Sequence, residues 1–418
     1  MRNIALYTFC FCVLLSGCGN RNKSIFNDNS NQLANNDSVD SIENDYDDSN
    51  MVYFLDFEQN VKNMPADTFT INSIAKDITF IPLETTDEAL LQVFMFKIAI
   101  INERYYISSG DYRYSNFSGI LEFDSTGRFL DYLMLETFGN GPEELPPRVL
   151  NWTSNPYAKL LFASSSRQIL LHSFNDSCTN KYNLDSSSYD ECLLNDGTIV
   201  SLPNPLGFGG NPAMPYLHFR NQKGKILHSV YYSQKRNIEF KIADGGVPIS
   251  IYGLYPQYNG NALFQDILND TLYCIRSMYD INPYIIIHRG SLAPVIKDAT
   301  DQVTRNQKIY YGTTLDTKKY FFIRYAYRNE QYTAIWDKKT STLIANIKAD
   351  LNDENEKNVS SNWNFVKYRM PNGKKILINI SYYLDGKLYA ALDAEQAMEF
   401  FPDIVSDDNP VLMIINIG

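Results

Sequence analysis

Short strands that recur in groups are the feature that most constrains the fold of this chain. Only residues 394–401 show helical spacing; elsewhere, short runs rich in Val, Ile, Tyr and Phe alternate with turn residues. The clearest group contains four such runs, at residues 96–100, 104–108, 120–124 and 128–132. Because runs of this kind joined by tight turns pair as antiparallel hairpins, this group predicts one four-stranded antiparallel sheet.

Weaker copies of this group follow along the rest of the chain. Four antiparallel strands in sequence order form one blade of a β-propeller, so the copies predict a second to a sixth blade. The expected strands of the second blade are 159–163, 168–174 and 181–184, and those of the third are 191–194, 198–202, 216–220 and 225–231. The fourth blade is expected to contain 250–255, 262–267, 271–275 and 284–288. The fifth is expected to contain 320–327, 332–337 and 342–347, and the sixth 365–369, 387–392 and 411–417.

The sixth group lacks a fourth strand, and one early segment has no group of its own. Residues 77–83 have the pattern of a strand. Pairing that strand beside residues 411–417 would close the ring, and closure hides the sheet edges that otherwise invite aggregation. We therefore expect an all-β fold in one domain over residues 51–418: a six-bladed β-propeller closed by an N-terminal strand that pairs with the C-terminal blade.

Composition agrees with this fold and excludes one class of partner. Aromatic residues make up 14% of the chain, with 30 Tyr and 24 Phe, and such residues favour strands. The formal net charge is −11. Nucleic-acid binding needs a basic surface, so we expect no nucleic-acid partner.

The first residues predict export to the cell envelope. Arg2 precedes an apolar run, residues 4–15, that is too short to span a bilayer and is typical of a signal peptide. The following Ser16-Gly17-Cys18 resembles the lipobox of bacterial lipoproteins, which implies a signal peptide over residues 1–17 and a lipid on Cys18 that anchors the chain in a membrane. Gly19 in place of Asp favours the outer membrane, with either leaflet left open. Residues 18–50, rich in Asn, Asp and Ser, are expected to form a flexible tether.

Several motifs, taken in order, resemble a known family. They are residues 80–85 (FIPLET), 120–130, 139–144 (GNGPEE), 269–273 (NDTLY), 336–340 (WDKKT) and 409–412 (NPVL). Together they resemble the six-bladed β-propeller lipoproteins of Gram-negative gut bacteria, whose blade pattern is related to NHL repeats. In that family a Gly and an aromatic residue usually stand where this chain has Glu143 and Leu145. The resemblance implies a fold and an export route, and no established activity.

Histidines and cysteines point to structural roles. His172 and His218 fall in third strands and His228 and His288 in fourth strands, away from the central channel, and none has zinc-site spacing. We therefore expect no metal and no cofactor. Cys178, Cys192 and Cys274 remain beyond the anchor region; a Cys178–Cys192 disulfide is one alternative, and buried free thiols are favoured.

Long loops give the candidate binding site. In a propeller, loops that join the second strand to the third and loops that join successive blades share one face, and loops on a rigid scaffold often carry binding residues. Aromatic rings beside Arg and Asn suit stacking on sugar rings and hydrogen bonds to hydroxyl groups, although the same rings could simply pack the loops. The candidate ligand-binding residues are Tyr112, Arg113, Tyr114, Glu144, Arg148, Phe208, Asn211 and Arg236.

Three functions remain open at this stage. The favoured one is binding of a glycan, a peptide or another envelope protein on the loop-rich face. An enzyme, such as a lyase or hydrolase in the central channel, predicts inward-facing ionisable groups with shifted pKa values; no nucleophile motif supports it. A scaffold in an envelope complex predicts a large apolar surface patch.

Overall fold

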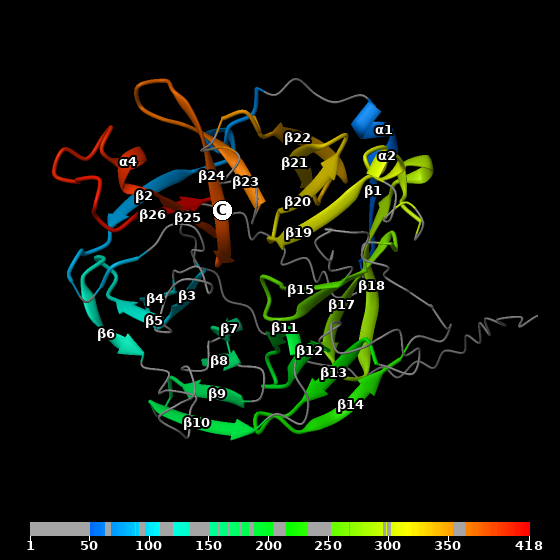
Figure 1. Cartoon of the computed structure of the whole chain (residues 1–418), viewed down its shortest axis with the longest axis horizontal. Helices are drawn as coiled ribbons and strands as arrows, with labels where there is room; N and C mark the ends of the chain where they lie inside the picture. The colour runs from blue at the N-terminus through cyan, green and yellow to red at the C-terminus, as the bar shows by residue number, and fades with distance from the viewer. Residues whose placement is uncertain are drawn as a thin grey trace, which may run out of the picture. The chain divides into compact units, whose positions relative to one another are not determined.

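The computed structural model describes residues 51–62, 68–87, 89–91, 97–108, 120–133, 151–157, 159–164, 168–175, 177–183, 188–203, 215–231, 252–266, 268–295, 298, 302–353, 356 and 364–418. All of them belong to the unit Ser49–Gly418. Their strands form six antiparallel sheets arranged as a six-bladed β-propeller, which confirms the predicted fold class (Figure 1). None of the helices in these ranges has the length and apolar character needed to cross a membrane.

The first five blades follow the predicted order of strands. Blade 1 contains β3 (Lys97–Ile101), β4 (Arg104–Ser108), β5 (Ile120–Phe123) and β6 (Phe129–Leu133); blade 2 contains β7 (Asn151–Asn155), β8 (Leu160–Ser164), β9 (Gln168–Ser173) and β10 (Cys178–Asn183); blade 3 contains β11 (Ser188–Leu193), β12 (Ile199–Pro203), β13 (Leu217–Arg220) and β14 (Ile226–Val230). Blade 4 contains β15 (Tyr252–Pro256), β16 (Ala262–Asp266), β17 (Thr271–Ser277) and β18 (Asp280–His288); blade 5 contains β19 (Tyr310–Asp316), β20 (Tyr320–Tyr327), β21 (Glu330–Asp337) and β22 (Thr342–Lys348).

The predicted closure is confirmed. Strand β2 (Asp77–Pro82) pairs antiparallel with β26 (Val411–Asn416), from Asp77 opposite Asn416 to Pro82 opposite Val411. Strand β2 thereby takes the outer edge of blade 6 (Figure 1). The N-terminal and C-terminal parts of the ring are joined through one ladder of backbone hydrogen bonds.

Blade 6 differs from the prediction at its inner side. Its sheet runs β2-β26-β25-β24-β23, where β23 is Asn364–Arg369, β24 is Lys375–Leu384 and β25 is Lys387–Leu392. Strand β24, absent from the predicted set, contacts the inner strands β3 and β19 of the neighbouring blades. The prediction that residues 365–369 form one of four regular strands is therefore wrong: β24, β25, β26 and β2 are the four blade strands, and β23 is an additional strand beside β24.

A second N-terminal strand was not predicted. Strand β1 (Tyr53–Asp56) pairs in parallel with the end of β18, from Tyr53 opposite Ile285 to Asp56 opposite His288. It leads into α1 (Phe57–Lys62), where the Phe57 ring stacks on Trp336 with centroids 5.4 Å apart. This segment thus packs into the apolar core between blades 4 and 5.

The remaining helices are short. They are η2 (Ile71–Ser73), η5 (Gly290–Leu292), α2 (Gln302–Arg305) and α4 (Ala394–Ala397). Helix α4 confirms the helical spacing seen at its position in the sequence, and the Asp393 side chain caps it by accepting a hydrogen bond from the Gln396 amide.

We expect closure of the ring to depend on the apolar face of β2. The Phe80 ring lies 5.7 Å from the Phe401 centroid and 6.1 Å from those of Tyr368 and Phe400. Replacing it, Phe80→Ala, should lower the free energy of unfolding by about 2 kcal/mol, measured by guanidinium titration, because a partly buried ring is lost. The matched change on β1, Phe54→Ala, should cost less than about 1 kcal/mol, because Phe54 is 52% exposed. An equal loss in both variants would contradict the role of β2.

Candidate functional site

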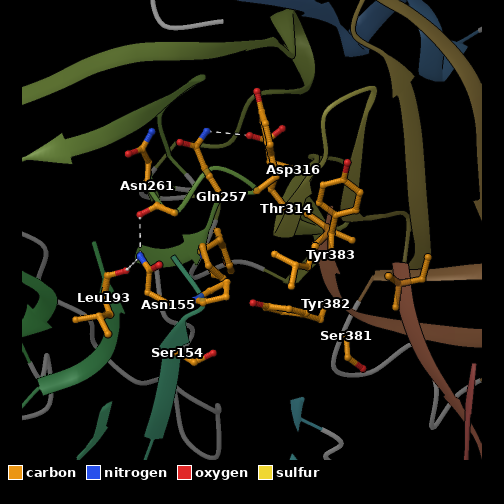
Figure 2. A pocket seen from close by; sticks show the side chains of 18 of the residues that line it. Ser154, Asn155, Leu193, Gln257, Asn261, Thr314, Asp316, Ser381, Tyr382 and Tyr383 are labelled. Atoms are coloured by element: carbon orange, nitrogen blue, oxygen red, sulfur yellow. Dashed lines mark hydrogen bonds between the residues drawn. The ribbon is translucent and has the colours of Figure 1, made fainter. Parts of the chain in front are cut away.

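A cavity of about 90 Å³ lies where the inner strands of four blades end (Figure 2). Its walls come from β7, β15, β19 and β24, from the β7–β8 and β15–β16 turns, and from single residues at the ends of β11 and β23. The lining residues are Ser154, Asn155, Pro156, Tyr157, Leu193, Tyr255, Pro256, Gln257, Tyr258, Gly260, Asn261, Thr313, Thr314, Leu315, Asp316, Asn364, Ile380, Ser381, Tyr382, Tyr383 and Leu384.

Two irregularities in the sheets border this space. Strand β23 begins at Asn364, opposite Ile380, so the last residues of β24 run past it and line the cavity. Strand β19 carries a β-bulge between Tyr311 and Thr314, where its register with β20 shifts. Bulges of this kind re-aim side chains and are common beside functional sites.

The turns around the cavity are held together by hydrogen bonds. The Asn155 side chain donates to the Gly260 carbonyl at 3.2 Å, and the Tyr157 hydroxyl donates to the Tyr258 carbonyl at 2.6 Å (Figure 2 shows the first). Gly260 has φ +76°, and a Cβ there would lie 2.0 Å from Asn195 Oδ1, so only glycine fits. Blades 2, 3 and 4 are thereby linked at this end of the channel.

Tyrosine dominates the apolar part of the wall. The five that line it are Tyr157, Tyr255, Tyr258, Tyr382 and Tyr383. Burial raises the pKa of Tyr157 to about 12 and also raises the pKa of Tyr382 and Tyr383. These phenols therefore stay protonated at neutral pH, as rings for stacking and as hydrogen-bond donors.

One buried ion pair closes the wall on the side of blades 4 and 5. Lys338 Nζ lies 2.7 Å from Asp316 Oδ1, with the two side chains 4% and 0% exposed. Gln257 Nε2 donates to Asp316 Oδ2 at 2.8 Å (Figure 2). Burial raises the pKa of the Asp316 carboxyl, and the Lys338 ammonium opposes that rise. The carboxylate thus faces the cavity with its charge already balanced.

Aromatic rings surround the ammonium of this pair. Lys338 Nζ lies 4.6 Å from the ring centroid of Phe321, 4.7 Å from Tyr258 and 5.5 Å from Tyr53, and it donates to the Tyr284 hydroxyl at 3.0 Å. Cation–π attraction of this kind is strongest where water is excluded. Tyr53 belongs to β1, so the N-terminal segment helps to hold the charge beside the cavity.

Three polar groups in the wall have no hydrogen-bond partner among the described residues. They are Thr313 Oγ1, Thr314 Oγ1 and Asn364 Oδ1, all buried atoms, and Thr314 and Asn364 are only 3% and 4% exposed. Buried polar groups are normally paired, and leaving one unpaired costs free energy. Groups of this kind in a cavity wall can bind the hydroxyl groups of a ligand.

A second set of charges lies on other inner strands. Burial lowers the pKa of Lys97, at the start of β3, and the nearby carboxylates of Asp190 and Glu191 on β11 oppose that shift. The carboxylate of Asp190 also accepts hydrogen bonds from the Glu191 and Leu254 amides at 3.0 and 3.3 Å. Lys97 stands at the start of β3, whereas Asp190, Glu191 and Cys192 run along β11 up to Leu193, which lines the cavity.

The predicted loop-face residues and the predicted lipidation residue lie outside the described residues. They are Cys18, Tyr112, Arg113, Tyr114, Glu144, Arg148, Phe208, Asn211 and Arg236. The loop-face site therefore stays a prediction. The cavity, at the opposite ends of the strands, was missed because its residues stand far apart in the sequence and carry no motif; the signal available was the polar character of β7 and β19.

The histidines lie in the predicted strands, and the cysteines are free thiols as favoured, although Cys178 is exposed where a buried thiol was expected. His172, His218, His228 and His288 belong to β9, β13, β14 and β18, the third or fourth strands of their blades, as predicted. Burial, with a smaller effect of Arg220, lowers the pKa of His218 to about 4. Cys178, Cys192 and Cys274 are free thiols, the first exposed and the others buried. In the part of the chain that the structure describes, no group of three or more His, Cys, Asp or Glu could hold a metal ion.

We expect removal of one partner of the buried ion pair to lower the stability of the protein strongly. In Lys338→Met the carboxylate of Asp316 would remain buried without its counter-charge, so the free energy of unfolding should fall by about 3–5 kcal/mol, measured by denaturant titration. Adding Asp316→Asn should restore most of the loss. In the same blade, Lys348 pairs with Glu330 at 2.9 Å on the surface, and Lys348→Met should cost at most about 1 kcal/mol. Equal costs for the two lysines would refute the importance of burial.

Comparison with known proteins agrees with the fold. The structure of a "putative exported protein" from Bacteroides fragilis is 15% identical in sequence with a TM-score of 0.59, over 88% of this chain and 100% of its own. A virginiamycin B lyase from Staphylococcus aureus is 10% identical with a TM-score of 0.41, over 81% of this chain and 99% of its own. No curated protein matches the chain. A family model described as "Domain of unknown function (DUF4934)" matches residues 52–416, almost the whole propeller, and this chain therefore belongs to that family.

Proposed function

We propose that this protein is an exported, lipid-anchored β-propeller that binds the terminal sugar of a glycan in the cavity at the end of its channel. The observation that carries this proposal is the set of unpartnered polar groups, Thr313, Thr314 and Asn364, in a wall otherwise rich in tyrosine. Sugars offer many hydroxyl groups to such atoms and an apolar ring face to tyrosine.

The size of the cavity supports a terminal residue rather than a whole oligosaccharide or peptide. Pockets that enclose a complete small-molecule ligand usually measure about 300 Å³ or more, and this cavity measures about 90 Å³. Tyr157, at its rim, is 50% exposed, so the space is reached from solvent at this end. The hydrogen-bonded turns around it provide the rigid wall that specific binding needs.

The loop-rich face is proposed as a separate site for a glycan, a peptide or an envelope partner. Its support is the sequence alone, through Tyr112, Arg113 and Phe208. An array of glycans and peptides distinguishes binding at this face from binding in the cavity. It is probed with the chain from residue 50 onward, as wild type and with Tyr112→Ala and Phe208→Ala. Binding that both variants leave unchanged would exclude this face.

Glycan binding in the cavity predicts an unusual result for Thr314→Val. Because its hydroxyl group has no partner, removing it should leave the free energy of unfolding unchanged or raise it by up to about 1 kcal/mol, while affinity for the glycan falls about tenfold. Chemical denaturation and titration calorimetry measure the two effects.

A matched threonine in the same blade gives the control. Thr333 Oγ1 accepts a hydrogen bond from the Phe365 amide at 3.2 Å, so Thr333→Val should lower stability by about 1 kcal/mol and leave affinity unchanged. Loss of stability without loss of affinity in Thr314→Val would refute the binding role. Mass spectrometry of the recovered glycan then separates binding from catalysis, since a lyase or hydrolase would return shorter fragments.

The proposed anchor is tested at Cys18. Cells that make the wild-type protein and are fed labelled palmitate should yield a labelled protein in the outer-membrane fraction, because a multiply acylated cysteine stays in a bilayer. The Cys18→Ala variant should carry no label and leave the membrane. Equal label in both proteins would disprove the anchor. The name of the Bacteroides fragilis neighbour agrees with export.

A further inference from the structure

An arginine lies directly behind the bulged part of the cavity wall. Arg324, on β20, stands opposite the bulge of β19, because Tyr311 pairs with Tyr325 and Thr314 with Ile323. Its Nη1 atom lies 4.0 Å from the position that a Cβ of Gly312 would take. Gly312 has no side chain to fill the space in front of the guanidinium, and the next residue, Thr313, lines the cavity.

The Arg324 side chain has no carboxylate partner in the described part of the chain. Its Nη2 atom donates to Gln331 Oε1 at 3.2 Å, and its Nε atom is buried and makes no hydrogen bond. The buried guanidinium of Arg289, by contrast, pairs with Asp270 at 2.7 Å. Guanidinium groups stay charged in proteins, so a largely buried one without a counter-ion is an unusual feature.

The charged groups near the cavity differ in how they are paired. Asp316 is neutralised by Lys338, at 2.7 Å, and the Asp385 carboxylate lies near Tyr157 and Tyr382, whereas Arg324 has no carboxylate partner among the described residues. Burial lowers the pKa of Arg324, opposed only by the phenol of Tyr255, which lines the cavity. An anion that reached this guanidinium would meet a charged donor fork, and the Thr313 hydroxyl belongs to the bulge opposite Arg324.

We propose that Arg324 binds an anionic substituent of the glycan whose end enters the cavity, a uronic acid carboxylate or a sulfate ester. This inference rests on the proposed glycan binding and narrows it to acidic glycans. A carboxylate group is planar and a sulfate group is tetrahedral, and each presents two oxygens to which a guanidinium can donate two hydrogen bonds. Thr313 would supply a further donor from the bulge.

The test compares matched ligands on the full mature protein. An array of neutral, uronate-bearing and sulfated oligosaccharides selects the best acidic ligand, and calorimetry then compares it with its neutral counterpart. Wild type should prefer the acidic member by about tenfold or more, and Arg324→Gln should lose that preference while it still binds the neutral sugar. The uronate and sulfate arms decide which substituent is recognised.

Controls keep the result specific. Arg328→Gln removes the same charge from the exposed turn of the same hairpin and should change nothing. If Arg324→Gln does not fold, Arg324→Lys keeps the charge without the fork and should reduce the acidic preference. An unchanged preference in the folded Arg324 variants, or a wild type that binds only neutral glycans, would overturn the inference.

A thermal-melting experiment with inorganic sulfate distinguishes failure of the anion-site inference from failure of the proposed glycan binding. If no glycan binds wild type, glycan binding itself fails; sulfate that raises the melting temperature of wild type and not of Arg324→Gln would still support an anion site. Sulfate that acts equally on both proteins would overturn the site in that case.

Discussion

The backbone ladder between β2 and β26 is the constraint on which the rest of the structure depends. It joins the segment before the first blade to the last strand of the chain, so the six sheets form a ring instead of an open row. Closure fixes where each inner strand stands relative to the others, and the cavity is built from the ends of such strands in blades 2, 4, 5 and 6. A site whose walls come from separate blades can be rigid only in a closed ring.

Middle and inner strands of a blade meet different physical demands. Strands such as β20 and β21 are covered on both faces by the neighbouring blades, and their residues are largely apolar and buried. The inner strands β7 and β19 instead carry Asn, Ser and Thr to the cavity. Unpartnered polar groups, a balanced ion pair and an arginine without a carboxylate gather on this inner side, and they are the features that the packing of the blades does not explain.

This difference explains how much could be predicted from the sequence. Most strands with alternating or continuous apolar residues were found, and so was the partner of β2, because hydrophobic periodicity marks them. Strands β7 and β19 were missed because their polar sequences, NWTSN and YYGTTLD, resemble loops. Strand β24 carries a clear apolar pattern, and the prediction overlooked it when it assigned residues 365–369 as the inner strand.

The candidate site was beyond sequence reasoning for a related reason. Lys338 and Asp316 become a pair only through the hairpin of blade 5, and their aromatic surroundings include Tyr53 from the opposite end of the domain. No local sequence pattern predicts these contacts, because contacts between residues of different blades depend on how the strands are aligned in the folded ring. The loop-face residues, chosen for their chemistry, remain a separate prediction.

The shared cavity has a consequence for how this repeat protein can change over time. Repeat arrays often gain or lose units, because each unit contacts only its neighbours. Here the turns of blades 2, 3 and 4 are bonded to one another and a strand from before the first blade supports a charge in the fifth. Duplication or deletion of a blade would separate these partners and disrupt the site. The site therefore requires this number of blades, and one blade can no longer replace another.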